Sequence, residues 1–223
     1  MPSRYTLYET EDLGARFSVS GGLLGNLKKR YNISPTQSAP VIVTRDGVRH
    51  IEMMKWGFIP KGAKDANSVF RYKTFNIRSE GIFEKPATRD AIRTSRCLVP
   101  SNGYFEWTTG ADSKQPFLIH PTDQKLFSFA GICSTWQDPE GILWGTYSII
   151  TTIPSRDVET VNDRMPVILR ASDESRWLNP EIDNMNALYD VMRSYPDGML
   201  AIDKVGQGVN STKIDNSQLI KSI

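Results

Sequence analysis

The segment Arg96–Trp107 places one carboxylate in surroundings suited to acid-base chemistry. Glu106 stands between Phe105 and Trp107, two large aromatic residues. A carboxyl group in apolar surroundings loses hydration of its charged form, so its pKa rises toward the range used in general acid or base catalysis. The alternative is that Glu106 pairs with an arginine at the end of a strand. This segment alone leaves both interpretations open.

Two amides and an arginine are further candidates. Asn76 and Arg78 alternate along the strand-like run Thr74–Glu80, so their side chains project to one face. An amide and a guanidinium on one face can hold a sugar or phosphate oxygen, or equally satisfy loop carbonyls. Asn162 opens the run Asn162–Leu169, a polar corner followed by an apolar strand.

A tryptophan in a loop-like segment adds a possible contact to nucleic acid. Trp56 lies in Met54–Pro60, which has aromatic and proline residues that look exposed. A tryptophan on such a loop can stack on a base, although partial burial is its commoner fate.

The elements that position these residues are mostly strands. Val41–Met54 alternates apolar residues on either side of Asp46-Gly47, which predicts a β-hairpin. Pro116–His120 and Leu126–Cys133 flank a polar turn and predict a second hairpin.

Helices are expected later in the chain and at its periphery. Met185–Tyr195 has apolar residues on one helical face, Thr10–Phe17 predicts a shorter helix, and Ser172 can cap a third that runs to Leu178. The sequence therefore predicts an α+β fold with a curved, mostly antiparallel β-sheet or open barrel and peripheral helices. We expect a single domain over residues 1–223.

Composition limits the classes of function. A net charge of +2 and a pI near 8.5 permit contact with nucleic acid without requiring it. No apolar run approaches the roughly 18 residues of a membrane helix, and the N-terminus lacks a basic region followed by an apolar signal stretch, so we expect a cytosolic protein without membrane contact. Cys97 and Cys133 read as buried thiols, and the two histidines suggest no ligand cluster, so we expect no metal and no cofactor.

Several stretches together resemble the SRAP family, the SOS-response-associated peptidases that act on abasic sites in single-stranded DNA. They occur in family order over nearly the whole chain: Tyr31–Gln37, Lys55–Pro60, Asn76–Glu80, Arg96–Pro100, Gly103–Trp107, Phe129–Gly131, Ile150–Thr152 and Asp163–Leu169.

The resemblance implies a role for most of the candidate residues. It implies that Asn76 and Glu106 line the reaction centre. It further implies contacts to a sharply bent single strand of DNA: Arg4, Arg78 and Arg164 on phosphates, Trp56 and Trp107 supporting the bases or the pocket, and Thr152 beside them. Such contacts read the geometry of DNA rather than its sequence.

The chain departs from the family at two positions. Family members begin Met-Cys-Gly-Arg, and the exposed cysteine closes a thiazolidine with the ring-opened sugar aldehyde. This chain begins Met1-Pro2-Ser3-Arg4, so no thiol stands beside the amine. At Asn162 the family usually carries a histidine, and because an amide does not titrate, acid-base steps fall on Glu106 alone.

Three hypotheses follow. In the first, the protein binds abasic sites or junctions in single-stranded DNA without a durable crosslink, and associates with the nucleoid when bound. In the second, removal of Met1 exposes the secondary amine of Pro2, which attacks the sugar aldehyde and cleaves the strand as a lyase, with Asn76, Glu106 and Asn162 in the same catalytic centre. In the third, the fold is a catalytically inactive interaction domain.

Overall fold

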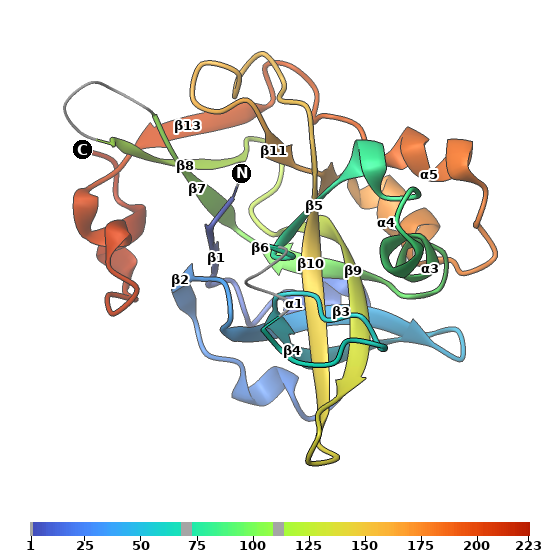
Figure 1. The fold of residues 1–223 in the computed structure, drawn as a ribbon. Helices are drawn as coiled ribbons and strands as arrows, with labels where there is room; N and C mark the ends of the chain where they lie inside the picture. The colour runs from blue at the N-terminus through green and yellow to red at the C-terminus, as the bar shows by residue number, and fades with distance from the viewer. Residues whose placement is uncertain (1, 68–72, 109–113) are drawn as a thin grey trace.

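Two β-sheets and four α-helices make up the described part of the chain (Figure 1). The structure is a computed structural model and describes residues 2–67, 73–108 and 114–223. Its strands are β1 (Arg4–Leu7), β2 (Arg30–Ile33), β3 (Ser38–Arg45), β4 (Val48–Trp56), β5 (Asn76–Arg78), β6 (Arg96–Ser101), β7 (Gly103–Trp107), β8 (Pro116–Pro121), β9 (Phe127–Gln137), β10 (Leu143–Thr152), β11 (Met165–Pro166), β12 (Ile168–Leu169) and β13 (Leu200–Lys204). Its helices are α1 (Leu13–Phe17), α3 (Pro86–Thr94), α4 (Ala171–Leu178) and α5 (Met185–Val191), and short 3-10 turns cover Leu24–Asn26, Ser79–Gly81, Gln207–Asn210 and Ser217–Ile220.

Five strands of the larger sheet close into a barrel. Strand β10 pairs with β4, β4 with β3, β3 with β6, β6 with β9, and β9 returns to β10. Closure satisfies both backbone edges of these strands. The β10 pairings with β4 and β5 are parallel, and the other strand pairings between described residues are antiparallel. The predicted α+β fold and mostly antiparallel pairing are confirmed, and the barrel is closed rather than open.

The first predicted hairpin is confirmed at β3 and β4. Asp46 and Gly47 both have positive φ, 51° and 76°, as a tight two-residue turn between twisted strands requires. Gly131 of β9 is closely surrounded by neighbouring strands. A Cβ added there would lie 2.8 Å from the Cys97 Sγ and 3.1 Å from the carbonyl oxygen of Ser148, so the position accepts only glycine.

The smaller sheet has the order β13-β8-β7-β1-β2 and is antiparallel throughout. Strand β8 pairs here with β7 and β13, whereas β9 belongs to the barrel. The predicted second hairpin, between Pro116–His120 and Leu126–Cys133, is therefore wrong. The polar turn between these segments carries the chain from one sheet to the other, and turn residues look the same in either case.

The helices lie where the sequence predicts them, with different boundaries. Helix α5 ends at Val191 rather than Tyr195, and α1 begins at Leu13 rather than Thr10. Helix α4 takes Arg170 as its N-cap, so Ser172 lies inside the first turn instead of capping it. None of the helices in the described part of the chain is long and apolar enough to cross a membrane.

One hydrophobic core joins the two sheets. Tyr5 of β1 and Tyr104 of β7 belong to the same buried cluster as Trp56, Phe129 and Tyr147 of the barrel. The Tyr5 ring lies 5.2 Å from the Trp56 ring, edge to face, and its hydroxyl lies 2.7 Å from that of Tyr147. These contacts fix β1, and with it the beginning of the chain, against the barrel.

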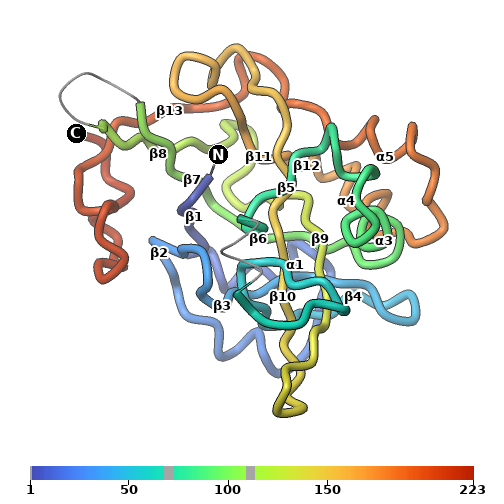
Figure 2. The backbone as a smooth tube through the Cα atoms, viewed as in Figure 1, coloured from blue at the N-terminus to red at the C-terminus, as the bar shows by residue number. Residues whose placement is uncertain are grey.

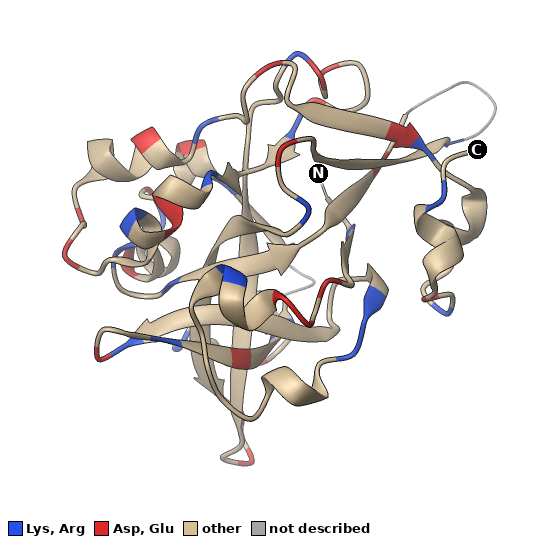
Figure 3. Ribbon diagram, turned by 180° about the vertical axis from the view of Figure 1, so that it is seen from behind, with Lys and Arg blue, Asp and Glu red and all other residues tan. Residues whose placement is uncertain are grey.

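The two chain ends lie on different parts of this framework. The chain begins near β1 and β7 in the centre of the view, and the C-terminal segment packs beside β2 and β7 (Figure 2). Seen from behind, basic and acidic residues alternate over the visible elements (Figure 3), in keeping with the small net charge.

Candidate active site at the start of the chain

Strand β7 buries the candidate carboxylate. Glu106 is 2% exposed and, by strand alternation, shares a face of β7 with Tyr104. Burial raises the pKa of Glu106 to about 7, and the charge of Asp163 acts in the same direction. Burial and the charge of Glu106 also raise the pKa of Tyr104. At neutral pH the Glu106 carboxyl can therefore both take up and release a proton.

Asn162 holds one oxygen of Glu106. Its Nδ2 donates to Glu106 Oε2 over 2.9 Å, and its Oδ1 accepts the backbone N–H of Arg164 over 3.1 Å. Because a backbone N–H only donates, the amide oxygen must face Arg164 and the amide NH₂ must face Glu106. At this place Asn162 acts as a hydrogen-bond donor to the carboxylate, and it lowers the pKa of Glu106 in opposition to burial.

Asn76 holds the start of the chain. It lies on β5, which pairs in parallel with β10 through Asn76 and Ile149. The Asn76 Nδ2 donates to the carbonyl oxygen of Pro2 over 2.7 Å. Its Oδ1 is buried and accepts no hydrogen bond from the described residues. Pro2 is buried, whereas Met1 lies outside the described residues.

The pairing of β1 with β7 brings these two amide contacts together. Arg4 pairs with Phe105 and Tyr5 with Tyr104. Continued by one residue, this antiparallel register places Ser3 opposite Glu106. Asn76 binds the carbonyl of Pro2, and Ser3, the next residue in the chain, lies opposite Glu106. Pro2, Asn76, Glu106 and Asn162, all predicted from the sequence, lie at one place in the fold.

The three candidate arginines differ in exposure and in how many of their nitrogens have hydrogen-bond partners. Arg4 donates from NH1 to the carbonyl of Ser3, its Nε is buried without a partner among the described residues, and burial lowers its pKa. Arg164 is 8% exposed and is bound through both terminal nitrogens, to Glu80 and to Thr151, with its Nε likewise buried and without a described partner. Arg78 is exposed at the end of β5.

The two tryptophans do not present their rings to the reaction centre. Trp56 is the last residue of β4, is 0% exposed and donates its indole N–H to the carbonyl of Phe75, so the ring that looked exposed on a loop is buried in the core. Trp107 alternates with Glu106 along β7 and packs with Phe105 on the opposite face, where its N–H donates to Asn210. Thr152 is 5% exposed and pairs with Met165 at the edge of the site.

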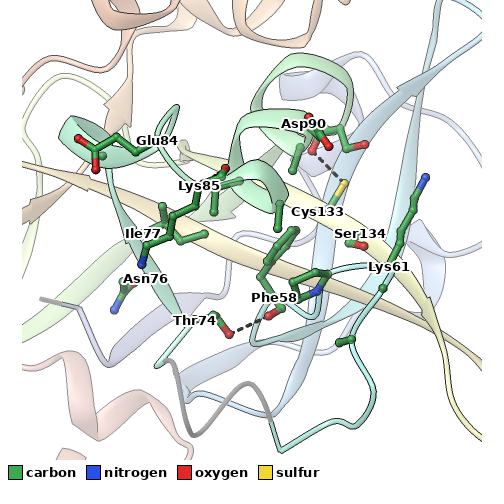
Figure 4. A pocket seen from close by; sticks show the side chains of 18 of the residues that line it. Phe58, Lys61, Thr74, Asn76, Ile77, Glu84, Lys85, Asp90, Cys133 and Ser134 are labelled. Carbon is green, nitrogen blue, oxygen red and sulfur yellow. Dashed lines mark hydrogen bonds between the residues drawn. The ribbon is translucent and has the colours of Figure 1, made fainter.

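A groove of about 1440 Å³ opens beside this site. Figure 4 shows Asn76 at one end, Cys133 and Ser134 at the other, and Phe58 between them. Its rim carries basic side chains, namely Lys61, Lys64, Lys73, Arg78 and Lys85, and also acidic ones, namely Asp65, Glu80, Glu84 and Asp90. The groove is therefore mixed in charge. Cys97 and Cys133 are both buried free thiols, as expected.

Sequence reasoning missed one residue of the site. Glu80 lies in the 3-10 turn after β5 and accepts hydrogen bonds from both terminal nitrogens of Arg164, over 2.6 and 2.8 Å. The signal was present, since Glu80 closes the matched stretch Asn76–Glu80, two residues after Arg78. No group of three or more His, Cys, Asp and Glu side chains in the described ranges gathers as metal ligands would.

Comparison with known proteins gives a consistent result. The chain is 34% identical over 225 residues to the abasic site processing protein YoqW of Bacillus subtilis, with all of both chains covered. It is 29% identical over 231 residues to the abasic site processing protein HMCES of Gallus gallus, covering 89% of this chain and 68% of that one. A crystal structure of a protein from Bacteroides thetaiotaomicron matches with a TM-score of 0.89 at 26% identity, covering 99% of both chains.

The family model described as SOS response associated peptidase matches residues 1–212. This match spans every element that builds the site, from the held Pro2 to the corner at Asn162. The chain belongs to the SRAP family.

Proposed function

We propose that this protein binds abasic sites in single-stranded DNA, as part of the response to DNA damage, at the centre formed by Pro2, Asn76, Glu106 and Asn162. The observation that carries the proposal is the hydrogen bond from Asn76 to the Pro2 carbonyl, which anchors the start of the chain beside a buried carboxyl. The names of the curated relatives, abasic site processing proteins, support the same substrate class.

Unused hydrogen-bonding capacity supports contact with a sugar and phosphates. The buried Asn76 Oδ1 and the Nε groups of Arg4 and Arg164 have no partner among the described residues. Buried polar atoms without partners cost free energy, so a ligand that supplies partners is favoured. In our proposal Asn76 accepts a hydroxyl of the opened sugar. Arg4, Arg78 and Arg164 face phosphates, and Thr152 and Trp56 support the walls.

The bound state lacks the family's thiazolidine. That ring requires an amine and a thiol on one residue, and residue 2 is proline. Cys97 and Cys133 are buried within strands and have no free α-amine, so neither replaces the missing thiol. The complex is therefore held by non-covalent contacts or by a reversible bond to an amine.

A second candidate, an abasic-site lyase, is favoured by the pKa of Glu106 near 7. Once Met1 is removed, the neutral Pro2 nitrogen attacks C1′ of the aldehyde, and loss of water gives an iminium ion. The Glu106 carboxylate removes a C2′ proton, and the electron pair expels the 3′ phosphate. Water then hydrolyses the iminium and restores the amine.

The test uses protein whose first residue is defined by mass spectrometry and a single-stranded DNA with one abasic site, with and without borohydride. Binding predicts a gel shift that weakens steeply as salt rises, because phosphate contacts release counterions. Intact single-stranded DNA and a duplex with a strand junction show whether the abasic site itself is preferred. Equal affinity for all three DNAs contradicts the proposal.

The same gel separates the two candidates. A borohydride-dependent adduct on the N-terminal residue, with strand cleavage, establishes amine catalysis. The matched control is protein acetylated at its N-terminus, which keeps the arginines and Glu106 but has no nucleophile. If the protein with a free N-terminus binds the DNA but forms no adduct, the result supports the non-covalent binder and contradicts the lyase.

A further inference from the structure

Glu80 is tied to the one arginine of the site that is almost completely buried. Its two carboxylate oxygens accept from NH1 and NH2 of Arg164 over 2.6 and 2.8 Å. The Glu80 side chain is 50% exposed, whereas that of Arg164 is 10% exposed. Such a two-point contact fixes the plane of the guanidinium as well as its position. The hydrogen bonds from Arg164 lower the pKa of Glu80, so the carboxylate stays charged at neutral pH.

Arg164 connects this contact to the reaction centre. Its NH2 also donates to the carbonyl of Thr151 over 2.8 Å, and its backbone N–H donates to Asn162 Oδ1 over 3.1 Å. Asn162 in turn donates to Glu106 over 2.9 Å. Arg164 therefore links Glu80, which lines the groove, to the buried Glu106: its guanidinium binds Glu80, and its backbone N–H binds the Asn162 side chain that donates to Glu106.

We propose that Glu80 is a positioning residue: by holding Arg164 it fixes the corner 162–164, and so keeps the Asn162 amide turned toward Glu106. Glu80 touches no reacting atom. Its consequence for catalysis rests on the proposed function, but its effect on Glu106 is measurable in the protein without DNA. Asn162 lies in the connection between β10 and β11, outside regular strand pairing, where its backbone N–H donates to the carbonyl of Val158 over 3.0 Å and the Glu80 contact holds the neighbouring Arg164.

The direction in which the titration midpoint of Glu106 moves when Glu80 is replaced distinguishes a positioning role of Glu80 from a direct effect of its charge. Removing the negative charge of Glu80 would, by electrostatics alone, make Glu106 easier to ionise and lower its titration midpoint. Releasing Asn162 removes a hydrogen bond to the carboxylate and raises that midpoint, by about half to one pH unit. Tyr104 on β7 and Asp163 beside Asn162 are the other titratable described residues whose charges couple to Glu106, and neither is altered by the substitution.

The experiment measures the titration of Glu106 by carboxyl carbon NMR in the full chain, with Glu106→Gln identifying the signal. Glu80→Gln is expected to raise the midpoint, and Glu80→Asp, which keeps the charge, to restore part of it. Glu84→Gln is the matched control, since Glu84 lines the same groove and has no ion pair recorded in the described part of the chain. The Glu106 midpoint in the Glu84→Gln variant should equal that of the unaltered protein.

Coupling to Asn162 completes the test. Asn162→Ala should raise the midpoint by itself, and Glu80→Gln added to it should raise it no further, because both act through one hydrogen bond. An unchanged or lowered midpoint in Glu80→Gln, or full additivity in the double variant, overturns the inference. Failure of the protein to bind abasic DNA, with the midpoint shifted as expected, refutes the proposed function and leaves the role of Glu80 standing.

Discussion

Two buried glutamates of this protein, equal in exposure, have different partners. Glu174 of α4 and Glu106 of β7 are each 2% exposed. Glu174 accepts from both terminal nitrogens of Arg16, over 2.8 and 2.9 Å, and from the hydroxyl of Ser128 over 2.8 Å. Glu106 accepts the neutral amide of Asn162, and its pKa rises to about 7.

The difference identifies what the two carboxylates do. A guanidinium and a hydroxyl bind Glu174, and these contacts join α1, α4 and β9. A carboxyl whose pKa lies near neutrality exchanges its proton under physiological conditions. Burial alone therefore does not mark a catalytic carboxylate.

The largest expected effect is on stability at the structural glutamate. Glu174→Ala should lower the free energy of unfolding by about 3 kcal/mol, because it leaves the Arg16 side chain, which is 23% exposed, and the Ser128 hydroxyl without this partner. Urea denaturation followed by circular dichroism measures it. A loss below about 1 kcal/mol, the range of surface pairs, would mean that Glu174 is no more structural than an exposed residue.

The complementary substitution should affect chemistry and spare the fold. Glu106→Gln keeps the shape of the side chain and its hydrogen bond from Asn162 but cannot transfer a proton. Strand cleavage, which requires removal of the C2′ proton, should slow by about 100-fold, while the borohydride-trapped adduct still forms and gel-shift affinity for abasic DNA changes little. Equal rates of strand cleavage in both proteins would remove Glu106 from the proton-transfer step.

The pH dependence of stability gives a third test. The pKa of Glu106 rises on folding from its ordinary value of 4.5 to about 7, so between these values the folded state binds more protons than the unfolded state. Stability therefore falls as the pH rises through this window, by about 2.5 kcal/mol between pH 5 and pH 8. Thermal or urea unfolding of the unaltered protein against Glu106→Gln, which has no such titration, isolates this contribution. A difference between the two proteins that is constant with pH contradicts the raised pKa.

The smallest expected effect concerns the opposite face of β7. Trp107→Phe removes the hydrogen bond to Asn210 and should cost about 1 kcal/mol of stability. Affinity for abasic DNA should stay unchanged, because the ring packs away from Glu106. A loss of DNA binding without a loss of stability would mean that the indole itself contacts the nucleic acid.

Local features of the sequence predict local features of the fold. The Asp46-Gly47 turn, the late helix and the alternation of Asn76 with Arg78 follow from backbone preferences within a few residues. The sheet to which β8 belongs cannot be predicted in this way, because β8 pairs with β13, which is far along the chain, as well as with β7. Pairing of that kind depends on the whole core rather than on the turn that follows β8.

The candidate site likewise has features that local sequence predicts and features that depend on distant parts of the chain. The environment of Glu106 is readable from its aromatic neighbours, but the orientation of Trp107 is readable only once β7 is known to have one face on the C-terminal segment. The convergence of Asn76 with Pro2, and of Asn162 with Glu106, depends on contacts between residues 74 and 56 positions apart in the chain. Resemblance to a family supplies these long-range relations, and periodicity does not.

The hydrogen bond between Asn76 and Pro2 also bears on how this site can diversify. Asn76 contacts the main-chain carbonyl of residue 2 and makes no demand on its side chain. The contact that positions residue 2 is thus independent of the side chain that residue 2 carries. Exchange of one codon, such as Pro2→Cys, would change the available bond chemistry while leaving the anchoring contact in place, so that lineages can gain or lose a covalent reaction without rebuilding the fold.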